Sequence, residues 1–258
     1  MELISKISKG TKMDQIYIPK NRPGFHTGEY VKIIPVNERP KDNYYVYNIK
    51  EVPPIKIEIA KQIFQIIESM INYDNIIITG SFLDENFKFN DIDIIIITEN
   101  KKEIEKSIKE KLKIEVHTIL FNQSLLIEAL KIDPKWRLML SRCISKKRIA
   151  PLPQRKLKFR YLDVQLIESK TLMINFNYLT GKEKYKLTRN MMAISMFIKN
   201  KNISDKSIEK EIEKELDTNI EDLKNNLVTN DFFKRYKTFY SKLEKEIIEN
   251  ASKQEKDA

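Results

Sequence analysis

The chain has 258 residues, of which 41% are hydrophobic and 33% are charged, and its formal net charge is +10. A basic surface attracts phosphate, whether in nucleic acid, in nucleotides or on an anionic membrane. The single cysteine excludes an intramolecular disulfide, and the presence of only two histidines argues against a zinc site. No apolar run approaches the roughly 20 residues that span a bilayer, and residues 1–6 have no secretory-signal character. We therefore expect a cytoplasmic protein with no membrane partner.

Short strands separated by turns are predicted for the first fifty residues. Strand-like alternation or β-rich composition occurs over residues 15–18, 30–34 and 44–47. Three of the five glycines fall in this segment, and Pro53-Pro54 follows it. Because glycine and proline mark turns and boundaries, residues 1–52 are predicted to form a small β module.

Residues 53–145 change to a mixture of helical and strand periods. The pattern predicts, in order, a helix, a strand, a turn, a strand, a helix and a strand, over residues 55–72, 76–79, 80–81, 92–98, 101–111 and 112–121. The second of these strands is apolar on both faces, as in a strand inside a covered sheet. This order indicates an α/β core.

The rest of the chain is predicted to be helical. Two short helices, residues 125–130 and 135–143, complete the core, and a basic connector follows over residues 146–161. Longer helices are predicted over residues 163–199, 206–227 and 230–250, the first interrupted at Gly181. Residues 146–258 are thus expected to form a C-terminal α-helical domain.

A pair of carboxylates carries the chemistry that the sequence suggests. Asp91 and Asp93 lie two positions apart at the start of the buried strand, so both are predicted to face the same side of the sheet. Two like charges this close are unfavourable unless a cation compensates them. Mg²⁺ suits oxygen ligands of this kind and also binds nucleotide phosphates.

A glycine-serine turn precedes this pair. Gly80 allows a ligand to approach the backbone closely, and Ser81 is predicted to open a short helix, capped in a Ser-x-x-Asp pattern with Asp84. Backbone N–H groups at such a helix start bind phosphate. An ordinary turn and a strand-capping role for Asp91 and Asp93 remain the structural alternative.

Together, an apolar residue, Gly80-Ser81, nine intervening residues and Asp91-Ile92-Asp93 resemble the nucleotidyltransferase signature of the DNA polymerase β superfamily. The resemblance covers residues 55–121. It implies an α/β nucleotidyltransferase core, two Mg²⁺ ions, an NTP donor, and transfer of a nucleotidyl group to an acceptor. Phe82 departs from the family, since many minimal members carry an arginine directly after Gly-Ser.

The resemblance also implies a third carboxylate on the following strand. Glu115 is the candidate, as a metal ligand or as the base for the acceptor hydroxyl, although the family more often has aspartate there. An ordinary strand-edge charge is the alternative. His117, on the same strand face, is a candidate for orienting the acceptor or an ordinary packing residue.

Basic residues of the C-terminal part are candidates for contacts with the substrate. In this superfamily a helical domain often closes over the nucleotide, and Lys182 and Arg189 are the candidate phosphate ligands around the start of a helix behind Gly181. Tyr185 lies four residues before Arg189, on the same helix face. The basic connector, residues 146–161, suits either a nucleic-acid or triphosphate channel or a solvated linker.

The N-terminal module resembles the swapped-hairpin fold of AbrB-type transcription factors. The residues that carry this resemblance are Gln15-Ile16-Tyr17-Ile18-Pro19-Lys20 and Gly28-Glu29-Tyr30-Val31-Lys32-Ile33. The resemblance implies a homodimer that binds DNA, and Lys12, Lys20 and Arg22 suit phosphate contacts. The alternative is a module that only packs on the core.

The sequence therefore predicts a Mg²⁺-dependent nucleotidyltransferase whose acceptor is RNA, a protein side chain or a small hydroxyl compound. The alternative from another class is a nucleic-acid-binding regulator or antitoxin-like protein with a vestigial transferase fold.

Overall fold

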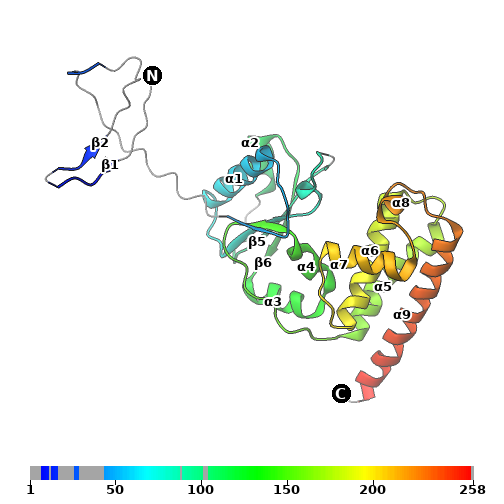
Figure 1. Cartoon of the computed structure of the whole chain (residues 1–258). Helices are drawn as coiled ribbons and strands as arrows, with labels where there is room; N and C mark the ends of the chain where they lie inside the picture. Colours follow the sequence, from blue (N-terminus) through cyan, green and yellow to red (C-terminus); the bar gives the residue numbers. More distant parts are fainter. Residues whose placement is uncertain are drawn as a thin grey trace. The chain divides into compact units, whose positions relative to one another are not determined.

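The chain divides into two units, Met1–Lys41 and Asp42–Ala258 (Figure 1). The structure, a computed structural model, describes residues 7–11, 13–16, 26–28, 44–87, 89–100 and 104–256. In the first unit, β1 (Ile7–Ser8) pairs antiparallel with β2 (Gln15–Ile16), which begins where a strand is predicted.

Several predictions for the N-terminal module lie outside the described residues. They are the strand over residues 30–34 and the phosphate contacts of Lys12, Lys20 and Arg22. The resemblance to AbrB-type proteins and the DNA-binding dimer stay predictions.

A mixed sheet forms the centre of the second unit, with five strands among the described residues. Its spatial order is β3 (Tyr45–Tyr47), β7 (Cys143–Ser145), β4 (Asn75–Thr79), β5 (Ile92–Ile97) and β6 (Val116–Phe121). Neighbouring strands are antiparallel except β5 and β6, which are parallel. The register sets Thr79 beside Asp93, and Asp93 beside His117. The end of β4 and the beginnings of β5 and β6 therefore meet.

Helices cover both faces of this sheet (Figure 1). On one face, α1 (Pro54–Glu68) and α2 (Glu105–Leu112) share a core with Ile76, Ile78 and Ile94. On the other, α3 (Gln123–Ile132) and α4 (Pro134–Ser141) share a core with Ile77 and Ile95. The continuous isoleucine runs of β4 and β5 suit this burial on both faces. The predicted helix and strand order is confirmed, and the fold is mixed α/β.

One strand belongs to a different sheet from the predicted one. Tyr45–Tyr47 is predicted within the N-terminal β module, but as β3 it pairs with β7 at the edge of the sheet. The pairing partner is distant in sequence: Tyr47 lies opposite Cys143, 96 residues away. Local alternation identifies a strand but does not identify a partner at such a distance in sequence.

Two element boundaries also differ from the prediction. The helix predicted to reach Cys143 ends at Ser141, and Cys143 begins β7, where it is buried. The strand predicted from residue 112 begins at Val116, because α2 extends to Leu112 and Lys113 turns the chain with a φ of 58°. Glu115 therefore lies just before β6.

The C-terminal part is helical, as predicted. It contains α5 (Phe159–Asn175), α6 (Gly181–Ile198), α7 (Asp205–Leu216), α8 (Ile220–Lys224) and α9 (Asn230–Lys256). A common core joins them, and the buried Tyr236 hydroxyl donates a hydrogen bond to the Ser169 carbonyl over 2.8 Å. The predicted interruption at Gly181 is confirmed, because Thr180 and Glu183 form a capping box that starts α6 there.

No helix in the described ranges is long and apolar enough to cross a membrane.

Gly181 provides a test of the helical packing. A Cβ at this position would lie 2.3 Å from the Lys224 carbonyl oxygen and 2.5 Å from the Asn226 backbone nitrogen. Because backbone atoms must move to accept it, we expect Gly181→Ala to lower the free energy of unfolding by about 1–3 kcal/mol in chemical denaturation. The adjacent exposed change Lys182→Ala should alter it by less than about 0.5 kcal/mol. Equal stability of the two variants would contradict this packing.

Candidate active site

The turn after β4 is in direct contact with the start of β5. Gly80 has a φ of 82°, which few residues other than glycine adopt. A Cβ built on Gly80 would lie 2.1 Å from Oδ2 of Asp93. Both the backbone conformation and this contact require glycine. The predicted phosphate turn and the predicted metal ligand are therefore neighbours in the fold.

Asp93 is at the centre of a small group of charges. Its side chain is 29% exposed, and its Oδ1 lies 3.4 Å from Nδ1 of His117. Burial raises the pKa of the Asp93 carboxyl, and the charge of Asp91 raises it further. The contact with His117 and the charge of Lys186, on α6, act in the opposite direction. The structure thus brings Asp91 and Asp93 together and adds His117 and Lys186.

Glu115 has a different partner. Its carboxylate lies 2.5 Å from the Lys109 ammonium of α2 and is 60% exposed. Its carbonyl accepts a hydrogen bond from the Ile92 N–H over 3.1 Å, so its backbone lies beside the beginning of β5. Within the described ranges, no three His, Cys, Asp or Glu side chains are grouped closely enough to hold a metal. Glu115 as the third ligand stays a prediction.

The predicted Ser81 cap is wrong. Ser81 begins the 3-10 helix η1 (Ser81–Leu83), and Gly80 occupies the N-cap position with no side-chain hydrogen bond. The Asp84 carboxylate binds Arg142 instead of closing the pattern. Glycine takes the cap position because the turn needs a positive φ. Ser81 remains exposed beside the turn.

A buried lysine organises the loop between Gly80 and Asp91. Lys56 of α1 is 0% exposed, and its ammonium donates hydrogen bonds to the carbonyls of Asp84 and Asn86, over 2.5 and 2.6 Å. The ammonium also lies 5.5, 4.7 and 5.4 Å from the ring centres of Phe82, Phe87 and Phe89. Burial lowers the pKa of Lys56. This lysine could not be selected from the sequence, because the aromatic residues around it show no regular spacing.

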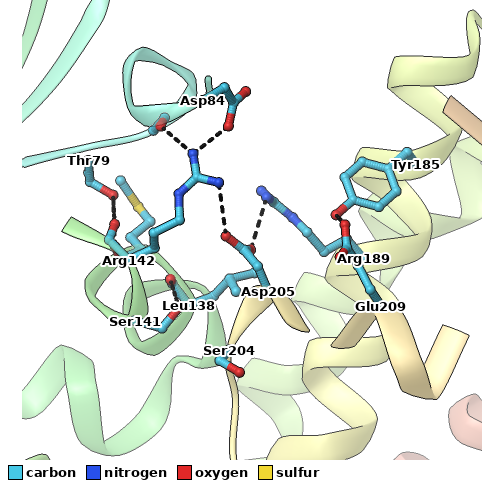
Figure 2. A network of polar contacts seen from close by, with 12 residues as sticks. Thr79, Asp84, Leu138, Ser141, Arg142, Tyr185, Arg189, Ser204, Asp205 and Glu209 are labelled. Atoms are coloured by element: carbon cyan, nitrogen blue, oxygen red, sulfur yellow. Dashed lines mark hydrogen bonds and ion pairs between the residues drawn. The ribbon is translucent and has the colours of Figure 1, made fainter. Parts of the chain in front are cut away.

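Arg142 supports the same loop from the other side. It contacts the Asp84 carboxylate, and its Nη2 donates to the Gly80 carbonyl over 3.4 Å. Its Nη1 lies 3.7 Å from the Asp205 carboxylate at the start of α7. Figure 2 shows Arg142 between Asp84 and Asp205. Arg142 could not be recognised as a site residue from the sequence, because it falls at the end of an ordinary amphipathic helix.

Arg189 approaches the same carboxylate from α6. Its Nη1 lies 3.6 Å from Asp205, and its guanidinium is 5.9 Å from the centre of the Tyr185 ring (Figure 2). Its Nε is buried and donates to no partner in the described part of the chain. The Tyr185 hydroxyl donates to Glu209, so this ring has a structural partner of its own.

Lys182 lies apart from this network. It is an exposed residue of the first turn of α6, and no ion pair joins it to a described carboxylate within 4 Å. Of the two predicted phosphate contacts, Arg189 belongs to the network that begins at Gly80 and Lys182 does not. Lys186, which the prediction did not include in the site, acts on Asp93 instead.

This arrangement suits a cation bound to a phosphate. Two neighbouring carboxylates, one with a pKa raised by burial, would be stabilised by a divalent ion. The charge of Lys186 acts on the same group, Arg142 contacts the Gly80 carbonyl, and Arg189 shares the Asp205 carboxylate with Arg142. Asp91 and Asp93 could hold the ion, and the cations could bind the phosphate oxygens that it also contacts.

Scanning the chain against protein-family models and searching the curated proteins for relatives gave no match.

Lys56 should be important for stability. In Lys56→Met, the carbonyls of Asp84 and Asn86 lose their hydrogen bonds to the ammonium, and hydrogen bonds to a charged group contribute about 1–3 kcal/mol. We expect the free energy of unfolding to fall by roughly that amount in chemical denaturation. Lys106→Met, an exposed change on α2, should have an effect below about 0.5 kcal/mol. An equally stable Lys56→Met variant would show that this ammonium does not hold the loop.

Asp93, unlike Lys56, should be unfavourable for the stability of the fold at neutral pH. Since its pKa is raised in the folded chain, its ionised form opposes folding at neutral pH. In metal-free buffer, Asp93→Asn should therefore raise the melting temperature at pH 7. The gain should disappear as the pH falls through the raised pKa toward the ordinary value of 3.8, since the carboxyl is then protonated in both states.

The exposed change Asp74→Asn serves as the control for Asp93→Asn and should leave the melting temperature unchanged. A melting temperature lowered by Asp93→Asn at every pH would indicate a purely structural role for this carboxylate.

Proposed function

We propose that this protein is a Mg²⁺-dependent nucleotidyltransferase that uses an NTP donor and a hydroxyl acceptor. The observation that carries the proposal is the contact between Gly80 and the carboxylate of Asp93, with the charge of Asp91 beside it. A turn that exposes backbone N–H groups next to paired carboxylates can bind a nucleotide phosphate and its metal ion together.

The surrounding side chains supply the remaining requirements. Lys186 and Arg189, both from α6, would contact the phosphates of the NTP and offset their charge. Arg142 fixes the turn through the Gly80 carbonyl and the Asp84 carboxylate. His117, in contact with Asp93, would orient the acceptor hydroxyl.

The donor set fits one Mg²⁺ ion at Asp91 and Asp93. When bound, the ion supplies positive charge that offsets the negative charge of the reacting phosphates. A second ion would require Glu115, whose carboxylate would have to exchange Lys109 for the metal. The acceptor (RNA, a protein side chain or a small hydroxyl compound) is chosen by residues outside this pair.

Incubation with Mg²⁺ and each labelled NTP tests the proposal. Pyrophosphate release and transfer of label to added RNA, to the protein itself or to small alcohols are measured together. Asp91→Asn and Asp93→Asn should each lower the rate at least about 100-fold, the size expected for loss of charge stabilisation at the reacting phosphate.

Asp74→Asn, an exposed carboxylate near the beginning of β4, is the matched control and should keep the wild-type rate. A thermal-shift titration adds a binding measurement, since Mg²⁺ with the correct NTP should stabilise the wild type but not Asp93→Asn. Turnover that survives both aspartate changes would exclude this site. Nucleic-acid binding without turnover or NTP stabilisation would favour a regulator.

A further inference from the structure

We propose that a pocket between α6, α7 and α9 is a separate binding site for a phosphate ester, such as a nucleotide or a 5′-phosphorylated nucleic-acid end. The pocket has a volume of about 360 Å³. That volume falls within the range of sites for small organic ligands. Its floor and wall include the buried Ser195 and Leu243 and the partly buried ring of Phe239.

The rim of the pocket is cationic. Lys199, Lys234, Arg235 and Lys242 line it, against the carboxylates of Glu215 and Glu246. Arg235 pairs with Asp217 at 2.9 Å and Lys234 with Asp231 at 3.6 Å, so those two charges are partly compensated.

Lys199 and Lys242 are the cations of the rim that form no ion pair, and the rim carboxylates Glu215 and Glu246 form none with a described residue either. Across the described residues, neither lysine forms an ion pair within 4 Å, and Lys199 contacts only the Phe239 ring, at 5.8 Å from its centre. The four cations of the lining outnumber its two carboxylates, and this excess of positive charge favours an anionic ligand.

Ser195 supplies the second observation. Its side chain is 2% exposed, yet its hydroxyl forms no hydrogen bond to any group in the described ranges. The hydroxyl is not one of the fully buried polar atoms without a partner, which in the described ranges are Gln165 Oε1 and Arg189 Nε, so its oxygen opens onto the pocket. Because Ser195 lines the pocket, its hydroxyl can donate a hydrogen bond to a ligand bound there. A hydroxyl at the base and ammonium groups at the rim match the oxygens of a phosphate.

Another pocket of the chain differs in the hydrogen bonds of its lining. It has a volume of about 200 Å³ and is lined by Asn48, Ser141, Ser204 and Arg142 among others. There the Asn48 amide donates to the Ser141 carbonyl, Ser141 to Leu138, and the Ser204 hydroxyl contacts Ser207. These amide and hydroxyl groups already have protein partners, so none of them is left to bind a ligand.

The proposed phosphate pocket is distinct from the candidate active site. Lys186 and Ser195 both belong to α6 and are nine residues apart, which is two and a half turns. They therefore point to opposite sides of the helix, with about 14 Å between them along its axis. Binding in this pocket does not depend on the proposed transfer reaction.

Calorimetric titration of the full chain in EDTA tests the proposal. The probes are inorganic phosphate, AMP against adenosine, and a 5′-phosphorylated RNA 12-mer against the same RNA without the phosphate. The phosphorylated member of a pair should bind at least about tenfold more tightly, the size expected for hydrogen bonds to a charged group. Preference for AMP identifies a free nucleotide as the source, and preference confined to the RNA identifies a nucleic-acid end.

Matched variants distinguish binding in this pocket from non-specific attraction of the phosphate to the basic surface of the protein. Lys199→Glu/Lys242→Glu should weaken binding of the phosphorylated probe about 100-fold, and Ser195→Ala about tenfold. Lys237→Glu/Lys253→Glu, with the same change in net charge on α9 but outside the pocket, should weaken it less than about threefold. Asp93→Asn should leave it unchanged, so failure of the transferase proposal would not affect the result. Equal effects of the two double variants, or no preference for the phosphate, would overturn the proposal.

Discussion

The contact between the Gly80 backbone and the Asp93 carboxylate constrains the whole candidate active site. A Cβ at position 80 would lie 2.1 Å from Oδ2 of Asp93, so the backbone of the turn and this carboxylate are in contact. The position of the turn and the position of the acidic pair therefore constrain each other. The sheet register sets this distance, since Thr79 of β4 lies opposite Asp93 of β5. A shift of one residue in that pairing would turn Asp93 to the other face of the sheet. The isoleucine cores on both faces are what prevent such a shift.

A buried lysine and a partly buried arginine then fix the chain that joins the turn to the acidic pair. Lys56 holds two loop carbonyls from α1, and Arg142 holds the Asp84 carboxylate and the Gly80 carbonyl from the opposite side. Burying these charges is unfavourable in itself. Hydrogen bonds to several loop groups compensate for it and leave the loop with one favoured conformation. The Asp205 carboxylate extends the network to α6 through Arg189, so the sheet and the helices support the same turn.

The sequence predicted those parts of the fold that depend on local patterns. The isoleucine runs of β4 and β5, the break at Gly181, and the closeness of Gly80, Asp91 and Asp93 all follow from spacing along the chain. Contacts between segments that are distant in sequence could not be predicted from these local patterns. The pairing of Tyr47 with Cys143, the enclosure of Lys56 by three phenylalanines, and the ion pair of Glu115 with Lys109 depend on tertiary packing. Contacts of this kind produce no periodic pattern in the sequence.

Helix α6 connects the two proposed sites through its periodicity. The charge of Lys186 acts on Asp93 and Arg189 pairs with Asp205, whereas Ser195 and Lys199 line the pocket. Between them the helix is buried in the common core of the helical part, where Met191 and Phe197 are fully covered. Close packing of this kind resists rotation or sliding of a helix. The position of the cations near Asp93 is therefore fixed by the same core that shapes the distant pocket, although the two sites share no side chain.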